Sequence, residues 1–257
     1  LPIYAIIETS TNKIITGCST SEIVKGVEII GYRAFKNMLD LYELNIPSTV
    51  NSISATAFDG CPNINKISVS RHNLTYDSRN KCNAIIETST NKLCIGSNNT
   101  IIPDGIEEIG ACAFCGRVGL DYISIPSSVS VIREFAFEGC LYLNSVILPA
   151  ELTEIYLSAF QNCISLQGVV FQNKIERIGE SAFKNCINLQ TLLLPNSINL
   201  IGFYAFEGCD NLLTLSLPDN DLCDILDRAF SSCSSLEKVV IPYGVQYVGN
   251  KAFANCS

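Results

Sequence analysis

The sequence predicts one elongated solenoid of the α/β class, mostly β with short helical turns, that spans residues 1–257 as a single domain. Three observations predict it. The dipeptide Ala-Phe recurs nine times along the chain, and the copies from Phe114 to Phe206 follow one another at intervals of 23 residues. Proline, glycine and cysteine recur at fixed offsets around these copies. Such self-similarity is the signature of stacked repeats, each of which buries its apolar edge against its neighbours.

The repeat unit has three parts, which Leu189–Cys209 shows as LQTLLLPNSINLIGFYAFEGC. The part L-x-x-L-x-L-P alternates, so it predicts a short strand with every second side chain pointing inward, and the proline ends that strand. The part [VIL]-x-x-I-G predicts a second short extended segment, after which glycine lets the backbone turn. The part G-x-x-A-F-x-x-C has the spacing of a single helical turn, with Phe and Cys on one side.

Stacking such coils predicts a parallel sheet along one side and an inner ladder of phenylalanine rings. Each ring buried in that ladder contributes on the order of 1.5–3 kcal/mol relative to an exposed one. The ladder consists of Phe35, Phe58, Phe114, Phe137, Phe160, Phe183, Phe206, Phe230 and Phe253.

The period breaks between Phe58 and Phe114, which lie 56 residues apart. The extra segment contains AIIETSTNKLCIG, and a near copy, AIIETSTNKIITG, stands 79 residues earlier. Each copy is apolar, then polar at Ser-Thr-Asn, then apolar again, and this pattern predicts a β-hairpin. We therefore expect hairpin-like inserts near residues 4–18 and 76–97.

The charge balance limits the classes of partner. The formal net charge is -8, and binding to nucleic acid needs clustered lysine and arginine, so we expect no nucleic-acid partner. The sequence has no continuous apolar run of about 18 residues, so we expect no membrane span in this chain. It shows no signal peptide either.

Most of the cysteines follow the repeat. Those three residues after a repeat phenylalanine form one inward column, in which we expect buried free thiols, because parallel side chains reach disulfide geometry with difficulty. A disulfide framework and a metal stack are the alternatives. The column consists of Cys61, Cys140, Cys163, Cys186, Cys209, Cys233 and Cys256. We expect the cysteines outside the repeat pattern to be partly exposed, namely Cys18, Cys82, Cys94 and Cys223.

Residues suited to catalysis are few. Cys112-Ala-Phe-Cys115 has the C-x-x-C spacing of zinc and redox sites, but a single such pair is a weak signal and it encloses a core phenylalanine. His72 is the only histidine, and its place at a strand end predicts a solvated loop residue. Glu107-Glu108 fall between apolar repeat positions, which predicts solvent-facing side chains rather than a glycosidase pair. We expect no catalytic residue, metal or cofactor.

The unit with Ile-Pro, Ile-Gly, Ala-Phe and Cys at these spacings resembles the BspA-like leucine-rich repeat proteins. The hairpin AIIETSTNK strengthens the resemblance, because similar inserts interrupt the repeats of bacterial members. The resemblance implies a right-handed leucine-rich-repeat superhelix with a concave parallel sheet. It also implies a secreted or surface-attached bacterial protein, and some members are adhesins. Departures from the pattern stand at Met38 in the cysteine column and at Ser70 and Gln172 in place of proline.

The candidate binding surface is the outward row of the concave strands. Apolar residues follow one another there, and exposed apolar surface often marks an interaction site. The alternative is that β-branched residues stand there because strands favour them. The candidates are Tyr122, Ile147, Val170, Leu193 and Val240. The expected partner is a protein or glycan, such as host matrix or a cell surface, and the alternative role is that of a structural spacer.

Both ends suggest that the chain is a segment of a longer array. The first residues, LPIYAII, are apolar, and Phe253 and Cys256 belong to an ordinary repeat. Solenoids need polar caps at their ends. We therefore expect further repeats or a cap after Ser257 and a secretion signal before Leu1.

Overall fold

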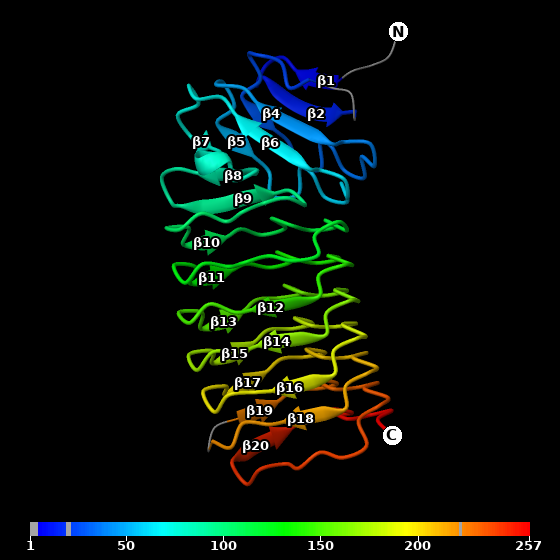
Figure 1. Ribbon diagram of the computed structural model, residues 1–257. Coiled ribbons are helices and arrows are strands. Elements are labelled where there is room, and N and C mark those ends of the chain that lie inside the picture. Colours follow the sequence, from blue (N-terminus) through cyan, green and yellow to red (C-terminus); the bar gives the residue numbers. More distant parts are fainter. Residues whose placement is uncertain (1–4, 19–21, 221–222) are drawn as a thin grey trace.

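The computed structural model describes residues 5–18, 22–220 and 223–257. The chain winds into a stack of about nine coils, with the N-terminal hairpin at one end and the C-terminal coil at the other (Figure 1). The expected solenoid of stacked parallel strands is confirmed. Tyr4, part of the first expected insert, lies outside the described residues.

The first extended segment of the repeat forms strands on one side of the stack. Their side chains alternate as expected, so that Leu44 and Val146 are buried between exposed neighbours. The strands pair in parallel within two sheets, β4-β6 and β12-β14-β16-β18. These strands are β4 (Glu43–Ile46), β6 (Lys66–Val69), β12 (Ser145–Ile147), β14 (Gly168–Val170), β16 (Thr191–Leu193) and β18 (Thr214–Ser216).

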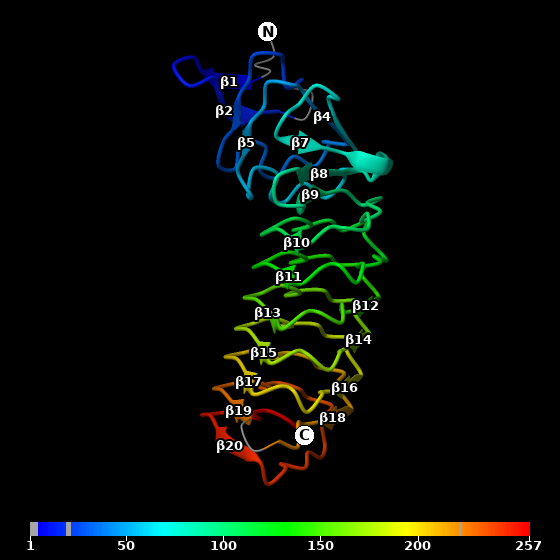
Figure 2. The same ribbon diagram turned by 90° about the vertical axis from the view of Figure 1, so that its left-hand side faces the viewer.

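The second extended segment forms the more continuous ladder of strands, on another side of the stack, and this ladder is divided between two sheets (Figure 2). Sequence alone predicted one parallel sheet, from the first segment, whereas both segments form parallel ladders. The described strands of this second ladder are β3 (Ile29–Ile30), β5 (Ser52–Ile53), β10 (Glu108–Ile109), β11 (Val131–Ile132), β13 (Glu154–Ile155), β15 (Arg177–Ile178), β17 (Leu200–Ile201), β19 (Cys223–Ile225) and β20 (Val245–Val248).

Two antiparallel hairpins interrupt the repeats. The first joins β1 (Ala5–Glu8) to β2 (Lys13–Gly17), and the second joins β8 (Ala84–Glu87) to β9 (Lys92–Gly96). In each hairpin the second strand pairs in parallel with the next coil, β2 with β3 and β9 with β10. The strand β7 (Tyr76–Asp77) pairs antiparallel with β8. Each hairpin therefore starts a new run of coils.

The prediction of a helical turn at the Ala-Phe segment is wrong. Among the described residues the one helix is a short 3-10 helix at Arg79–Lys81. The backbone of the Ala-Phe segment takes a positive φ two residues before many of the phenylalanines, as at Ser181 (55°) and Tyr204 (57°). Alternate N–H groups therefore point along the stack, and Phe183 N donates to Ala205 O of the next coil at 2.7 Å. The N–H groups between them donate within the coil, as Ala182 N does to Gly179 O at 3.3 Å.

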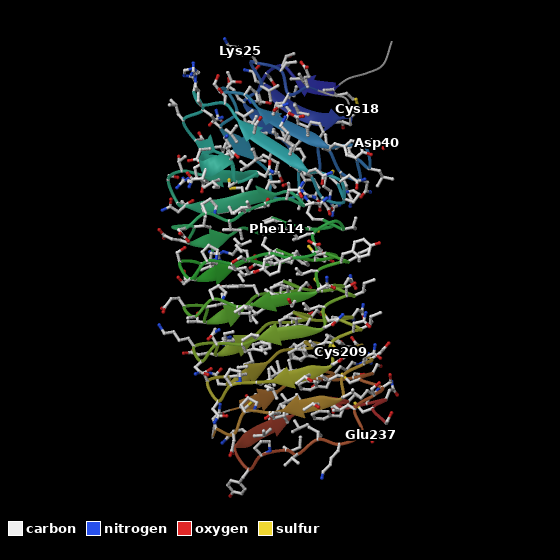
Figure 3. The ribbon with its side chains drawn as sticks, in the orientation of Figure 1. Cys18, Lys25, Asp40, Phe114, Cys209 and Glu237 are labelled. Atoms are coloured by element: carbon white, nitrogen blue, oxygen red, sulfur yellow. The ribbon has the colours of Figure 1, made fainter. Side chains whose placement is uncertain are left out.

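The phenylalanine ladder forms the core. Neighbouring rings from Phe114 to Phe253 stack with centroids 5.0–5.2 Å apart and nearly parallel planes. Phe35 and Phe58 form a separate stacked pair at 5.2 Å. The buried residues divide accordingly into an N-terminal cluster around Phe35 and Phe58 and a C-terminal cluster around the remaining rings. Figure 3 shows Phe114 within the stack.

The second hairpin lies between these two clusters. Ile85 and Ile95 pack in the N-terminal cluster, whereas Ile86 and Leu93 pack in the C-terminal one. Gly96 occupies the place of a repeat phenylalanine, because its N–H donates to Ala113 O at 2.8 Å as the ladder phenylalanines do in their coils. A Cβ at Gly96 would lie 2.0 Å from the Phe114 ring, so the position requires glycine.

Candidate binding face

The exposed side of the sheet β12-β14-β16-β18 carries an apolar row. Ile147, Val170 and Leu193 are 61%, 51% and 61% exposed, whereas the residue before each of them is buried. This alternation follows from the strand period of two, which places successive side chains on opposite faces. Ile147 pairs with Val170 in the ladder register, and the pairing of Gly168 with Thr191 sets the register that aligns Val170 with Leu193. The three side chains therefore follow one another across neighbouring coils.

A shallow hollow lies beneath this row. It has a volume of about 540 Å³, and Ile147, Val170 and Leu193 contribute to its wall together with Phe171. Gly168 leaves part of the hollow empty, because the place where a side chain would begin faces open space, with no atom within 4 Å. Its polar lining consists of Ser145, Gln167 and Thr191. None of these lining side chains is charged, so the hollow suits a neutral group.

A second hollow of about 690 Å³ lies further along the same side, toward the C-terminal coil. Val240 lines it, with Leu213 and the fully exposed Tyr243 beside it. Lys238 and Asp219 add a charge of each sign to its wall. This hollow is therefore more polar than the first.

The structure gathers the five sequence candidates only in part. Ile147, Val170 and Leu193 form one continuous row on three strands, and Val240 belongs to the second hollow. Tyr122 and Val240 are exposed, but both lie in segments without strand pairing. Gly168 and Phe171 shape the first hollow and were not among the candidates. Gly168 stands where neighbouring coils have Ser145 and Thr191, so its lack of a side chain was visible in the repeat register.

Of the other residues considered for catalysis, His72 and Glu107 are exposed and Glu108 is half-buried. His72 is exposed, and its Nε2 accepts a hydrogen bond from Arg71 Nε at 3.1 Å. Glu107 is exposed, and Glu108 Oε2 lies 3.0 Å from Arg133 Nη2. Among the residues with a described placement, no group of three His, Cys, Asp or Glu side chains has a metal-binding arrangement. In the same part of the chain, no helix is long and apolar enough to cross a membrane.

The column cysteines are inward, as expected. Each column sulfur donates to the carbonyl oxygen of the repeat phenylalanine in the preceding coil, for example Cys140 to Phe114 at 3.2 Å and Cys209 to Phe183 at 3.4 Å. Burial raises the pKa of the Cys140 and Cys186 thiols to about 12, so both remain protonated at neutral pH. Protonated buried thiols of this kind are inert.

The expectation of partial exposure was wrong for Cys82 and Cys223, which are both buried. Cys82 packs in the C-terminal cluster beneath the second hairpin, and Cys223 begins the paired strand β19. Cys18 and Cys94 are half-buried. Neighbouring coils therefore cover two sulfur atoms that the repeat pattern left outside the column.

Arg117 is the residue that sequence reasoning missed. It lies three residues after Phe114, where the column has cysteine, and it is almost completely buried. Its guanidinium donates to four carbonyl oxygens, at 2.8 Å to Cys61, 2.9 Å to Gly96, 3.2 Å to Cys115 and 3.4 Å to Phe58. Burial lowers its pKa. The residue thus ties the coil of Phe58 to the coil of Phe114 past the intervening hairpin.

Comparison with known proteins identifies the repeat. Residues 12–93, 84–180 and 153–257 match a family model described as BspA type leucine rich repeat region, in six copies. No functionally curated protein matches the sequence.

Several solved structures share the fold. A leucine-rich repeat protein from Eubacterium ventriosum has a TM-score of 0.80 at 23% identity, over 90% of this chain and 63% of its own. A leucine rich cell surface protein from Faecalibacterium prausnitzii has a TM-score of 0.60 at 23% identity, over 92% of this chain and 62% of its own. The pneumococcal vaccine antigen PcpA has a TM-score of 0.58 at 17% identity, over 91% of this chain and 59% of its own. The chain thus spans less than two thirds of the length of each.

Proposed function

The chain belongs to the BspA-type leucine-rich repeat family, and from this we propose that it is a non-enzymatic binding module. It recognises a protein or glycan through the exposed side of β12, β14 and β16, the side that sequence analysis expects to be concave. The proposed setting is extracellular, secreted or attached to a bacterial cell surface. The description of the Faecalibacterium prausnitzii neighbour as a leucine rich cell surface protein supports that setting.

The observation that carries the proposal is the uninterrupted apolar row over a hollow. Ile147, Val170 and Leu193 are each more than half exposed and share the wall of one hollow. Contiguous exposed apolar surface on a soluble protein commonly marks an interaction site. A rigid sheet also holds the row in place, so binding needs little ordering of these side chains.

The lining of the hollow indicates the chemistry of the partner. Its polar groups are the neutral side chains of Ser145, Gln167 and Thr191, and Phe171 offers an aromatic ring. An apolar protein side chain or the apolar face of a sugar ring suits such a surface. Charged groups contribute most of the salt dependence of binding. We therefore expect affinity for the partner to change little with ionic strength.

The test is a binding screen of the purified chain against immobilised matrix proteins, glycans and host cells, followed by substitution of the row. The double substitution Val170→Asp and Leu193→Asp places two charges in an apolar contact and should weaken binding at least about 10-fold. Both side chains are exposed, so the fold should persist.

The matched control is Leu39→Asp with Leu74→Asp, which adds the same charge at exposed leucines outside the hollow. We expect this control to bind as the unsubstituted chain does. Unchanged binding after the Val170 and Leu193 substitutions would place the site elsewhere.

The second candidate function is a structural spacer. The elongated stack in Figure 1 suits that role, and Ile and Val at outward strand positions need no ligand to explain them, because strands favour β-branched residues. A spacer predicts no saturable binding in the same screen. Saturable binding that the row substitutions remove excludes this alternative.

A further inference from the structure

The turn that follows the second hairpin carries two cysteines that the column does not explain. Cys112 lies two residues before Phe114 and Cys115 lies one residue after it, whereas the column thiols lie three residues after their phenylalanines. The N–H of Cys115 donates to Cys112 O at 3.1 Å, which closes a tight turn. Such a turn brings its end Cα atoms within about 7 Å, close to the upper limit of the range that a disulfide spans.

The two cysteines of this turn differ in exposure. Cys115 is buried, whereas Cys112 is half-buried and accessible at the surface of the turn. The neighbouring Cys115 thiol is the largest influence on Cys112 and lowers its pKa. The neighbouring Cys112 thiol, together with burial, raises the pKa of Cys115. The half-buried Cys112 is thus the more readily ionised member of the pair.

Two carboxylates flank the inner sulfur. Cys115 occupies the repeat position that holds Asp59 in the coil before and Glu138 in the coil after. Its Sγ lies 3.6 Å from Asp59 Oδ1 and 3.8 Å from Glu138 Oε2. Negative charge on both sides disfavours a Cys115 thiolate, so Cys115 keeps its proton until a base removes it. The same two carboxylates also oppose a thiolate at Cys112, whereas Arg33, whose Nε lies 3.8 Å from Asp59 Oδ2, favours it.

We propose that Cys112 and Cys115 are a dithiol–disulfide exchange site whose oxidant is a small-molecule disulfide. The Cys112 thiolate attacks one sulfur of the oxidant, forms a mixed disulfide and releases one thiolate. Cys115 then gives its proton to solvent and attacks the Cys112 sulfur, which releases the second thiolate. In sum, two protein thiols lose two electrons and two protons, one protein disulfide forms, and the oxidant becomes two thiols.

The column thiols offer no competing site. Each donates to a backbone carbonyl, and the thiols of Cys140 and Cys186 are buried with a raised pKa of about 12. Cys256 is half-buried, but it also donates to a carbonyl, that of Phe230, and burial raises its pKa. Cys94 is the useful comparison, because it is half-buried like Cys112 but burial raises its pKa to about 11. Exposure alone therefore does not distinguish Cys112 from Cys94. The difference is that Cys112 has a second thiol, Cys115, in the same turn.

The test uses the unsubstituted chain and oxidised glutathione. The folded protein is incubated with this disulfide at neutral pH, remaining thiols are blocked with iodoacetamide, and the products are mapped by mass spectrometry. We expect the peptide containing Cys112 and Cys115 to lose two hydrogens with no retained glutathione. A retained adduct on Cys112, or an earlier reaction at another cysteine, would overturn the proposal. Iodoacetamide alone should alkylate Cys112 at least about 10-fold faster than Cys94.

Three variants separate the two roles. Cys115→Ser removes the second attack, so a stable glutathione adduct should accumulate on Cys112. Cys112→Ser should leave residue 115 unmodified. The matched control Cys94→Ser should form the disulfide as the unsubstituted chain does. Circular dichroism checks that each variant is folded, and the map of the unsubstituted chain decides the matter if one is not. Equal disulfide or adduct formation in all three variants would overturn the proposal.

Discussion

The two hairpins have nearly the same sequence and different surroundings. AIIETSTNKIITG forms β1 and β2, and AIIETSTNKLCIG forms β8 and β9, with the same pairing and a bulge at the same place. Ile6 is 53% exposed in the first hairpin, whereas its counterpart Ile85 in the second is 0% exposed. The second hairpin is covered on both faces, by the coil of Phe58 and by the coil of Phe114.

The comparison teaches that the local sequence determines whether a hairpin forms, whereas the neighbouring coils determine how far the hairpin is buried. Each hairpin presents one apolar face to the coil that follows it, and a glycine, Gly17 or Gly96, leaves room for the next phenylalanine ring. The opposite face is apolar as well; the coil of Phe58 covers it in the second hairpin, whereas Ile6 on the first hairpin is exposed. Substitutions at matched positions should therefore have unequal effects.

The largest difference is expected for aspartate at the paired isoleucines. Ile85→Asp places a charge in the N-terminal cluster without a partner, so we expect a loss of about 4 kcal/mol or more in the free energy of unfolding. Ile6→Asp should cost about 1 kcal/mol or less, since the side chain reaches solvent. Urea denaturation measures both. Similar losses would contradict the difference in burial.

Arg117 and its counterpart Met38 sharpen the comparison, because each stands three residues after the phenylalanine that follows a hairpin. Arg117→Met leaves the carbonyls of Cys61 and Gly96 without their donor, so we expect a loss of about 2–4 kcal/mol in the free energy of unfolding. Met38→Leu removes no hydrogen bond and should cost less than about 1.5 kcal/mol. If Arg117→Met is as mild as Met38→Leu, Arg117 does not join the two clusters.

The two glycines give a smaller contrast. A Cβ would lie 2.0 Å from the Phe114 ring at Gly96 and 2.1 Å from the Phe35 ring at Gly17. Gly96→Ala should cost about 1–3 kcal/mol, because the hairpin is confined on both faces. Gly17→Ala should cost about half as much, because the first hairpin can move outward. Thermal unfolding of both variants tests this, and a larger cost at Gly17 would contradict the account.

Tyr76 gives the smallest effect at neutral pH. Its hydroxyl accepts a hydrogen bond from Ile53 N at 3.2 Å, so Tyr76→Phe should cost about 1 kcal/mol. Burial raises the pKa of Tyr76 to about 12, against about 10 in the unfolded chain. The stability contributed by the neutral phenol is fully present below pH of about 10 and is lost as the pH rises through about 12.

The measurement is urea denaturation at a series of alkaline pH values. As the pH rises from about 10 to beyond about 12, the free energy of unfolding of Tyr76→Phe should fall by about 2–3 kcal/mol less than that of the unsubstituted chain. The cysteine thiols titrate in both proteins, so the difference between the two curves isolates the phenol. Parallel curves would show that Tyr76 does not titrate with a raised pKa.

The repeat pattern predicted much of the fold because each coil meets almost the same neighbours. The ladder of rings, the cysteine column and the two hairpins follow from residues at fixed spacing, as Phe160 and Cys163 illustrate. The helical turn was wrong because spacing alone does not reveal a positive φ, which Ser181 adopts without being glycine. Bonds between coils stabilise that backbone, and such bonds appear only when the stack is formed.

The candidate site was predictable in one respect only. Strand alternation places Val170 and Leu193 outward, but the hollow depends on how Gly168 and Phe171 lie between neighbouring coils. The dithiol pair was visible as C-x-x-C, whereas the unequal exposure of Cys112 and Cys115 was not. Arg117 was visible from its position in the column, but its four carbonyl acceptors come from separate segments that the hairpin brings together.

Hydrogen exchange of the two hairpins tests the central claim most directly. Backbone amides of β8 and β9 should exchange slowly, since both faces of that hairpin are covered, while those of β1 and β2 should exchange much faster. The near identity of the sequences makes the intrinsic exchange rates closely similar, so a difference reports the stack. Equal protection of residues 5–17 and 84–96 would contradict the account.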